Sequence, residues 1–271
     1  MTNLREIIKY LENVAPRDLT VGEHDSRIEI GPQTEQEQLN TTVNRILIAT
    51  YPSGRVVTRS TQDKANLLIT HFPIFRYPSD QISGLDLVRV RLLAKNYISS
   101  YVLGSAIVGA RDGLTDAVVD ALELQKLQEF YTIGKYVDAA SLGRICQINE
   151  NMNHSRFADY VAMKMEQEAV KFTGDLDRKV DSILVCPGHY LGIPELIAAN
   201  QMNVKTIVTS GVAPETRLVA AEQGLNVIEL REFVMEELGM KRLRHRMSLE
   251  YPELKIEFTS SEPVSKNLRY R

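Results

Sequence analysis

The chain has 271 residues, a length typical of two domains or of one large one. Hydrophobic residues make up 44% and charged residues 25%, which is ordinary for a globular protein with a buried core. The formal net charge of -3 excludes the basic field that attracts nucleic acid, so small molecules and other proteins are the expected partners.

Targeting and redox signals are weak. No apolar run approaches the roughly 20 residues of a membrane span, and the amphipathic N-terminus is unlike a signal peptide. The two cysteines, Cys146 and Cys186, are too few for a disulfide framework and lack metal-binding spacing. These features predict a soluble cytoplasmic protein with no membrane partner.

The hydrophobic pattern predicts an α/β fold in both halves of the chain. Short continuous apolar runs are typical of buried parallel strands, and longer stretches with helical spacing alternate with them. In the first half we expect helices over 2–14, 85–96 and 115–124, strands over 45–49, 66–70 and 97–103, and one short strand at 27–30 within a polar loop. In the second half we expect strand-like stretches within 130–150, strands over 182–186, 205–209 and 225–228, and helices over 155–172, 194–200, 214–223 and 232–248.

The two halves resemble each other. The run 46–49 corresponds to 183–186, and the run 66–71 corresponds to 205–210, in the same order and at similar spacing. Chance similarity between strands rich in Ile, Val and Leu is the alternative, but order and spacing favour a repeat. We therefore expect two similar α/β domains around a shared cleft: residues 1–125 together with 224–271, and an inserted-like domain over 126–223.

His71 stands where functional residues commonly stand, directly after a buried strand. Its imidazole could bind a metal or move protons near neutral pH. The alternative is a histidine packed on Phe72 and Phe75, with both ring nitrogens bonded to backbone.

The segment Thr-His-Phe-Pro-Ile-Phe at 70–75 resembles the Thr-His-His-Pro-Leu-Phe signature of the Nif-three-like family (NGG-one interacting factor three). Its members are also called dinuclear-metal-centre hexameric proteins, or type 2 GTP cyclohydrolase I. The opening helix, the glycine-rich segment 104–116, the strand around Gly143 and the segment 224–228 are similar to the family in the same order. The resemblance covers most of the chain and implies a ring-shaped homohexamer with inward-facing clefts.

The resemblance also implies a two-metal site made by two adjacent His, one Asp, and a late His and Glu four residues apart. Carried over by position, these ligands fall on His71, Phe72, Val108, Glu232 and Glu236. Phe72 and Val108 have no lone pair for a metal, and Glu232 replaces a histidine, so only His71 and Glu236 keep the ligands of such a site.

One metal ion is still compatible with the remaining donors. Glu232 and Glu236 share one helix face because they are four residues apart. With His71 they form a ligand set suited to Zn, Mn or Fe. The alternative is that both glutamates lie on a solvated helix face and that no metal is bound.

A second candidate segment is the strand-to-helix loop 186–192, which contains His189. Backbone N–H groups at the helix start could bind a phosphate or carboxylate, and His189 could face the same cleft as His71. An ordinary tight turn is the alternative.

Two functional hypotheses follow. In the first, the protein is a metal-depleted binding or regulatory scaffold, and its cleft, lined by Phe72 and Val108, suits an apolar or planar small molecule. In the second, it is a mononuclear-metal hydrolase of the amidohydrolase or phosphohydrolase type, acting on a small heterocyclic or nucleotide-like substrate. The loss of ligands favours the first slightly.

Overall fold

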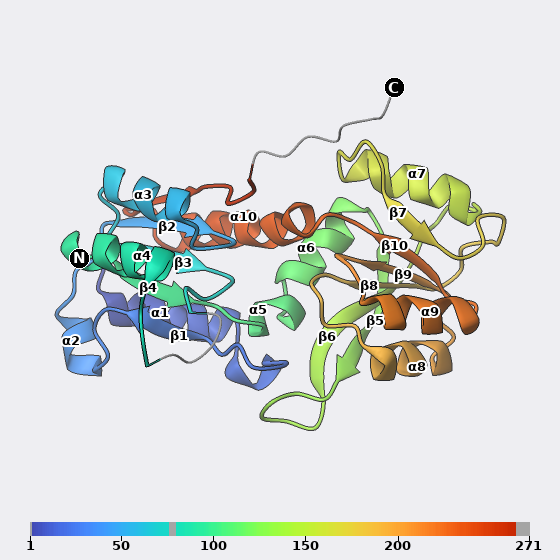
Figure 1. Ribbon diagram of the computed structural model, residues 1–271, viewed down its shortest axis with the longest axis horizontal. Helices are drawn as coiled ribbons and strands as arrows, with labels where there is room; N and C mark the ends of the chain where they lie inside the picture. The colour runs from blue at the N-terminus through green and yellow to red at the C-terminus, as the bar shows by residue number, and fades with distance from the viewer. Residues whose placement is uncertain (1, 76–79, 264–271) are drawn as a thin grey trace.

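The structure is a computed structural model that describes residues 2–75 and 80–263. Two β-sheets lie toward opposite ends of the long axis, each flanked by helices, and the long helix α10 (Glu232–Glu250) runs from one toward the other (Figure 1). The expected α/β class with two similar units is confirmed. Within the described residues, no helix combines the length and the apolar composition that crossing a bilayer requires.

The first sheet has five strands in the order β1-β4-β3-β2-β11. All neighbours in it are parallel except β1, which pairs antiparallel with β4. Its strands are β1 (Arg27–Ile30), β2 (Arg45–Ala49), β3 (Leu67–Thr70), β4 (Ser99–Val102) and β11 (Lys255–Phe258). The helices of this unit are α1 (Leu4–Val14), α2 (Glu35–Leu39), α3 (Gly54–Gln62) and α4 (Gly84–Lys95), with a 3-10 turn at Arg17–Leu19.

Both faces of the first sheet are buried, which explains its continuous apolar strands. Successive side chains of a strand point to opposite faces, so Ile46 and Ile48 pack with α1 and α10 while Leu47 packs with α3 and α4. The buried residues of α1 recur every three or four positions, and Asn3 begins that helix with a capping box.

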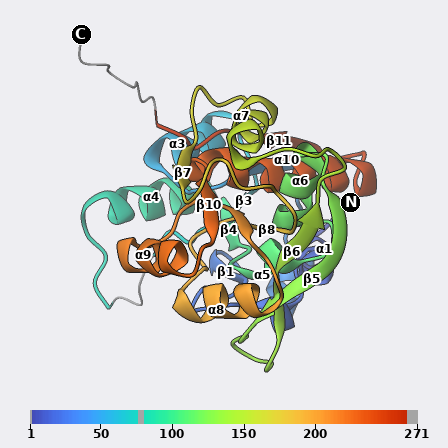
Figure 2. The same cartoon turned by 90° about the vertical axis from the view of Figure 1, so that its right-hand side faces the viewer.

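The second sheet has six strands in the order β5-β6-β8-β9-β10-β7. Its strands are β5 (Gln125–Thr132), β6 (Ala140–Gln147), β7 (Lys171–Thr173), β8 (Ile183–Cys186), β9 (Thr206–Thr209) and β10 (Asn226–Glu229). The helices around it are α5 (Ala106–Gly109), α6 (Leu114–Ala121), α7 (His154–Lys164), α8 (Ile193–Gln201) and α9 (Pro214–Glu222). Seen from the second unit's end of the molecule, α8 and α9 lie on the opposite side of this sheet from α7 (Figure 2).

The repeat lies in the parallel strands. Strands β2, β3 and β4 are mutually parallel neighbours, and so are β8, β9 and β10. Strand β10 therefore belongs to the second sheet, although the predicted domain limit at residue 224 assigns it to the first unit. The chain returns to the first sheet only after β10, because backbone pairing with β9 and β7 holds that strand in the second sheet.

Two other elements differ from the sequence-based expectations. The helix expected over 155–172 ends at Lys164, and residues 171–173 form an edge strand. Glu166 adopts a φ of 52°, which a continuing helix excludes. Within the expected polar loop, Thr34 and Glu37 form a capping box that starts the short helix α2.

Helix α10 connects the two units. Its first turns pack in the core of the second sheet through Met235, and its later turns pack in the core of the first through Met240 and Leu243. Gly239 lies against Leu114 of α6, where an added Cβ would come within 2.8 Å of the Leu114 backbone. This close packing brings the opening turns of α10 to the junction between the units.

Candidate functional site

Backbone hydrogen bonds fix His71 at the carboxyl end of β3. The N–H groups of His71 and Phe72 both donate to the Thr50 carbonyl, at 3.2 and 3.0 Å. The His71 carbonyl accepts from Gly104, 3.1 Å away. The imidazole is 1% exposed, so its position is set by the fold rather than by solvent.

Glu29 of β1 holds the loop that follows His71. Its buried carboxylate accepts the Ile74 N–H at 2.8 Å and pairs with Arg27 at 3.1 Å. Burial raises the pKa of this carboxyl, and the Ile74 hydrogen bond opposes part of that rise. The sequence analysis did not identify Glu29, because an acidic residue in a short strand is normally expected to face solvent.

Glu236 meets His71 across the junction. Its Oε2 lies 2.5 Å from His71 Nδ1, and its side chain is completely buried. Nevertheless, neither ring nitrogen of His71 and neither carboxylate oxygen of Glu236 has a hydrogen-bond partner with acceptable angles among the described residues. Buried polar atoms are nearly always hydrogen-bonded, so an exception of this kind marks a candidate functional position.

Glu232 lies one helical turn before Glu236 and closer to solvent. Its carboxylate accepts the Tyr51 hydroxyl at 2.6 Å and lies 3.5 Å from His189 Nε2. Burial raises the pKa of Glu232, but the bonds from His189 and Tyr51 outweigh it, so the pKa is lowered. The same contact raises the pKa of His189. The structure therefore brings His71 to Glu236 and His189 to Glu232.

Phe72 covers the imidazole. Its ring stacks on Tyr51, with centroids 4.3 Å apart and planes 9° apart, and its centroid is 4.2 Å from that of His71. Of the alternative considered for His71, packing on Phe72 is observed, whereas bonds from its ring nitrogens to backbone are absent among the described residues. The stack forms an aromatic wall beside the polar pairs.

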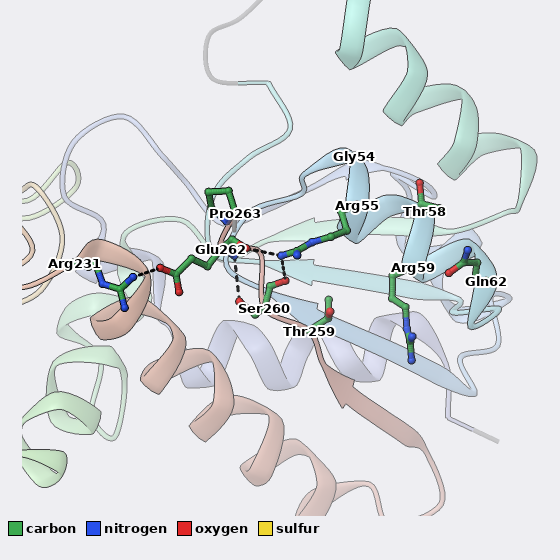
Figure 3. A pocket seen from close by; sticks show the side chains of 10 residues that line it. All are labelled: Gly54, Arg55, Thr58, Arg59, Gln62, Arg231, Thr259, Ser260, Glu262 and Pro263. Atoms are coloured by element: carbon green, nitrogen blue, oxygen red, sulfur yellow. Dashed lines mark hydrogen bonds and ion pairs between the residues drawn. The ribbon is translucent and has the colours of Figure 1, made fainter. Parts of the chain in front are cut away.

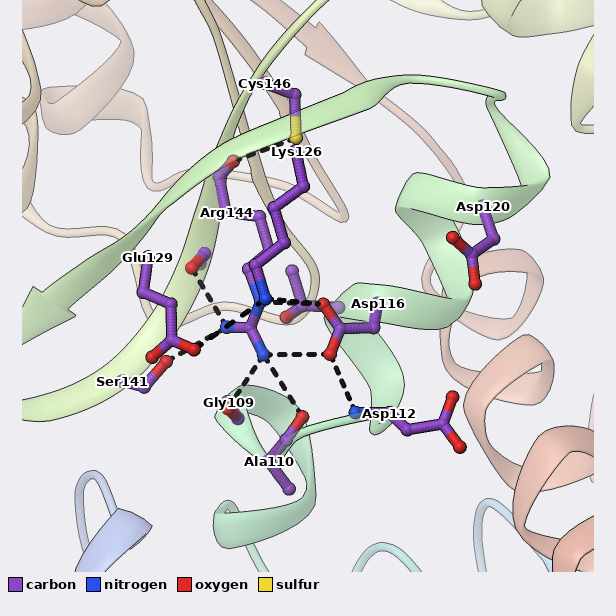
Figure 4. A network of polar contacts seen from close by, with 12 residues as sticks. Gly109, Ala110, Asp112, Asp116, Asp120, Lys126, Glu129, Ser141, Arg144 and Cys146 are labelled. Carbon is purple, nitrogen blue, oxygen red and sulfur yellow. Dashed lines mark hydrogen bonds and ion pairs between the residues drawn. The ribbon is translucent and has the colours of Figure 1, made fainter.

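Val108 lies in the core of the second unit. It is fully buried in α5, among apolar side chains that include Leu142 and Leu184. The segment around it is held by Thr115, whose hydroxyl donates to the Val108 carbonyl at 2.8 Å. The buried Arg144 donates to the next two carbonyls, of Gly109 and Ala110 (Figure 4).

The described residues do not fit a two-metal centre. Phe72 and Val108 offer no donor atom, and no group of three or more His, Cys, Asp or Glu side chains in the described part of the chain is arranged to hold a metal ion. Glu236 is buried, so the alternative of a solvated helix face does not describe it. The one-metal ligand set of His71, Glu232 and Glu236 stays a prediction.

His189 borders a cavity of about 570 Å³ between the loops that follow β8 and β9. Gly188 has a φ of 83°, and its N–H donates to Ser210 Oγ at 2.8 Å. One backbone donor of this loop is therefore already satisfied, as in an ordinary tight turn. His189 itself is well exposed and faces Glu232.

Comparison with known proteins decides the family. The profile of Duf34/NIF3 (NGG1p interacting factor 3) matches residues 2–266. This chain belongs to the Duf34/NIF3 family. Two relatives, each named "GTP cyclohydrolase 1 type 2 homolog", come from Clostridium acetobutylicum and Methanocaldococcus jannaschii. The first is 24% identical over 238 residues, 86% of this chain and 85% of the relative. The second is 21% identical over 251 residues, 90% of this chain and 94% of the relative.

Solved structures show the same fold. A Bacillus cereus protein related to NIF3 matches with a TM-score of 0.82 and 18% identity, over 100% of this chain and 99% of that one. A Staphylococcus aureus protein matches with a TM-score of 0.79 and 17% identity, over 100% of this chain and 99% of that one. At this identity the likeness establishes the fold alone, so the function of this Duf34/NIF3 protein has to be argued from its own residues.

Proposed function

We propose that this Duf34/NIF3 protein is a small-molecule-binding or regulatory scaffold that lacks the family's two-metal centre. The observation that supports it is the direct contact between His71 and Glu236, together with the Phe72 ring that covers the His71 imidazole. At 2.5 Å, Nδ1 of His71 and Oε2 of Glu236 lie closer together than two ligand atoms of one tetrahedral metal ion. Phe72 occupies the position where the resemblance places a second histidine.

The residues around the pair suit a planar, polar ligand. The Tyr51–Phe72 stack offers an aromatic surface, since offset or parallel rings attract further flat groups. The lowered pKa of Glu232 keeps its carboxylate ionised, so it accepts hydrogen bonds from N–H or O–H groups. A heterocycle with donors on one edge combines both features.

The second candidate is the mononuclear-metal hydrolase predicted from His71, Glu232 and Glu236. Nε2 of His71 and both oxygens of Glu236 have no hydrogen-bond partner within the described part of the chain, which favours it, because the ligand atoms of an absent ion would have this character. Against it, the described side chains contain no three-donor group, so one of the three would have to move. A bound Zn, Mn or Fe ion would supply an activated water.

Elemental analysis separates the two candidates. The purified, untagged protein, the His71→Ala variant and a His245→Ala control are incubated with Zn, Mn and Fe and then dialysed. The scaffold proposal expects background metal in all three, and small planar heterocycles that raise the melting temperature of the wild type. About one equivalent of metal, lost only in His71→Ala, would contradict the proposal and favour the hydrolase.

We also propose that the protein assembles as a homohexamer, as the family resemblance implies. Light scattering gives a direct test, because the single chain has a mass of 30.6 kDa. A monomer would end the assembly proposal and leave the ligand proposal intact. The expected cytoplasmic location stays a prediction from the sequence.

A further inference from the structure

A second cavity, lined by arginines, lies beside the first unit. Its volume is about 840 Å³, and it is formed between α3, the start of α10 and the segment that follows β11 (Figure 3). This volume is within the range of sites that bind small molecules. We call it the arginine cavity, after Arg55, Arg59 and Arg231 in its lining.

The charge of the arginine cavity is positive. Among the described residues, three guanidinium groups line it, whereas Glu262 contributes the one lining carboxylate. Arg59 pairs with Asp63 at 2.5 Å, and Arg231 pairs with Glu262 at 2.6 Å. Arg55 has no carboxylate partner among the described residues, since its recorded bonds go to two backbone carbonyls. A cleft lined by one sign of charge raises the local concentration of oppositely charged ligands.

Glu262 shows that the cavity accepts an anionic oxygen. Its carboxylate is held by Arg231, and its carbonyl accepts from Arg55 at 2.7 Å. The Ser260 carbonyl is also bound to Arg55, at 2.9 Å. The two guanidinium groups therefore converge on one acidic residue from different elements, α3 and the start of α10 (Figure 3).

The position of the cavity agrees with ligand binding. Strands β2 and β11 are parallel neighbours, and the residues after both of them line it. Ligands of open parallel sheets bind beyond the carboxyl ends of the strands. Gly54 leaves open space where a side chain would stand. Arg231 directly precedes Glu232, so the cavity adjoins the candidate site in the chain.

We propose that the arginine cavity binds a phosphate-bearing small molecule through Arg55 and Arg231, and that the Glu262 carboxylate competes with it for Arg231. A guanidinium presents paired N–H donors that match the oxygens of a phosphate. The volume leaves room for an organic part beyond the phosphate. This inference does not depend on what His71 and Glu236 bind.

Titration calorimetry with inorganic pyrophosphate, at one fixed low ionic strength, tests the proposal. Four full-length variants are compared with the wild type: Arg55→Gln, Arg231→Gln, Glu262→Gln and the exposed control Arg156→Gln. We expect the loss of either cavity arginine to weaken binding about tenfold, as for a charged hydrogen bond. Glu262→Gln should tighten binding about threefold, the strength of an exposed ion pair, and Arg156→Gln should change nothing.

Three results would overturn the proposal. The first is no pyrophosphate binding by either the wild type or Glu262→Gln, and the second is that Arg55→Gln and Arg231→Gln bind pyrophosphate as tightly as Arg156→Gln does. The third is that tricarballylate, an anion with carboxylates in place of phosphates, binds as tightly as pyrophosphate. Melting temperatures of all variants check that each is folded. His71→Ala should bind pyrophosphate like the wild type, so failure here and failure of the proposed function are distinguishable.

Discussion

Two largely buried polar pairs among the described residues, Arg144 with Asp116 and His71 with Glu236, differ in their hydrogen bonding. The Arg144 side chain is fully buried and makes two bonds to Asp116, at 2.7 and 3.1 Å (Figure 4). It also donates to Ser141 Oγ at 2.9 Å and to three backbone carbonyls between 3.0 and 3.2 Å. His71 and Glu236 touch at 2.5 Å, yet their polar atoms lack aligned partners among the described residues.

This difference separates a structural cluster from a candidate functional one. A guanidinium with every donor used ties α5, α6 and β6 together and leaves no capacity for a ligand. An unaligned imidazole and carboxylate retain that capacity, at a cost in stability that a purely structural site would not carry. The two clusters are thus expected to respond differently to substitution.

The largest effect is expected from Arg144→Met. The variant removes both Arg144 bonds from the Asp116 carboxylate, which keeps the Asp112 N–H as a donor, and it removes the donors to the Gly109 and Ala110 carbonyls. Breaking a buried pair from one side costs about 3–5 kcal/mol of unfolding free energy. Urea unfolding measures it, with the exposed Arg156→Met as control. A loss as small as that of the control would mean that Arg144 is not the structural member of the comparison.

A smaller effect is expected from the protonation of Asp116. Burial raises its pKa, but the Arg144 bonds outweigh this and lower the pKa below its ordinary value. The stabilisation is therefore complete above the unfolded-state pKa of about 3.9 and is lost as the pH falls through the folded-state pKa.

Asp116→Asn tests this assignment. At pH 7 the variant should lose about 1.5–3 kcal/mol, the value of a hydrogen bond to a charged group. Urea unfolding at a series of pH values should show a shallower acid decline than in the wild type. Parallel declines of the two proteins would assign the acid sensitivity to other carboxylates.

The smallest effect is expected from replacing both members of the other pair, in His71→Leu/Glu236→Met. Few neighbouring polar groups lose a hydrogen-bond partner in this variant. Exchanging a buried pair for apolar groups of similar size is often neutral or stabilising by about 1–4 kcal/mol. Urea unfolding should place this variant within about 1 kcal/mol of the wild type or above it. The matched Arg144→Met/Asp116→Leu variant should lose stability, because it leaves buried backbone carbonyls without a hydrogen-bond donor. Equal losses would remove the distinction between the clusters.

The strands of both parallel sets could be predicted from sequence, because buried strands leave continuous apolar runs. Strand β2 matches the expected residues 45–49, and β8 lies within the expected 182–186. The edge strand β7 was missed because three partly exposed residues carry no periodic signal. The boundary of the second unit was also misplaced, since an apolar run such as β10 does not say which sheet it joins.

Arg144 illustrates what a residue type alone does not reveal. It lies in the buried strand β6, where charged residues are rarely found unless paired. The apolar residues on either side of Arg144 in the sequence predict a buried strand, and a charged residue within such a strand is the signal that could have identified this arginine. Its partner Asp116 lies in the first turn of α6, where a negative charge is favoured in any helix, and the fold alone brings that helix beside β6.

By itself the sequence determined the α/β alternation, the two related sets of strands and the place of His71 at a strand end. These features are local, since each follows from the period and composition of a short segment. Only the tertiary structure decided that Glu236 is buried against His71 while Glu232 stays near solvent with His189. Spacing put both glutamates on one face of α10, but the burial of each depends on how that helix packs between two units far apart in the chain.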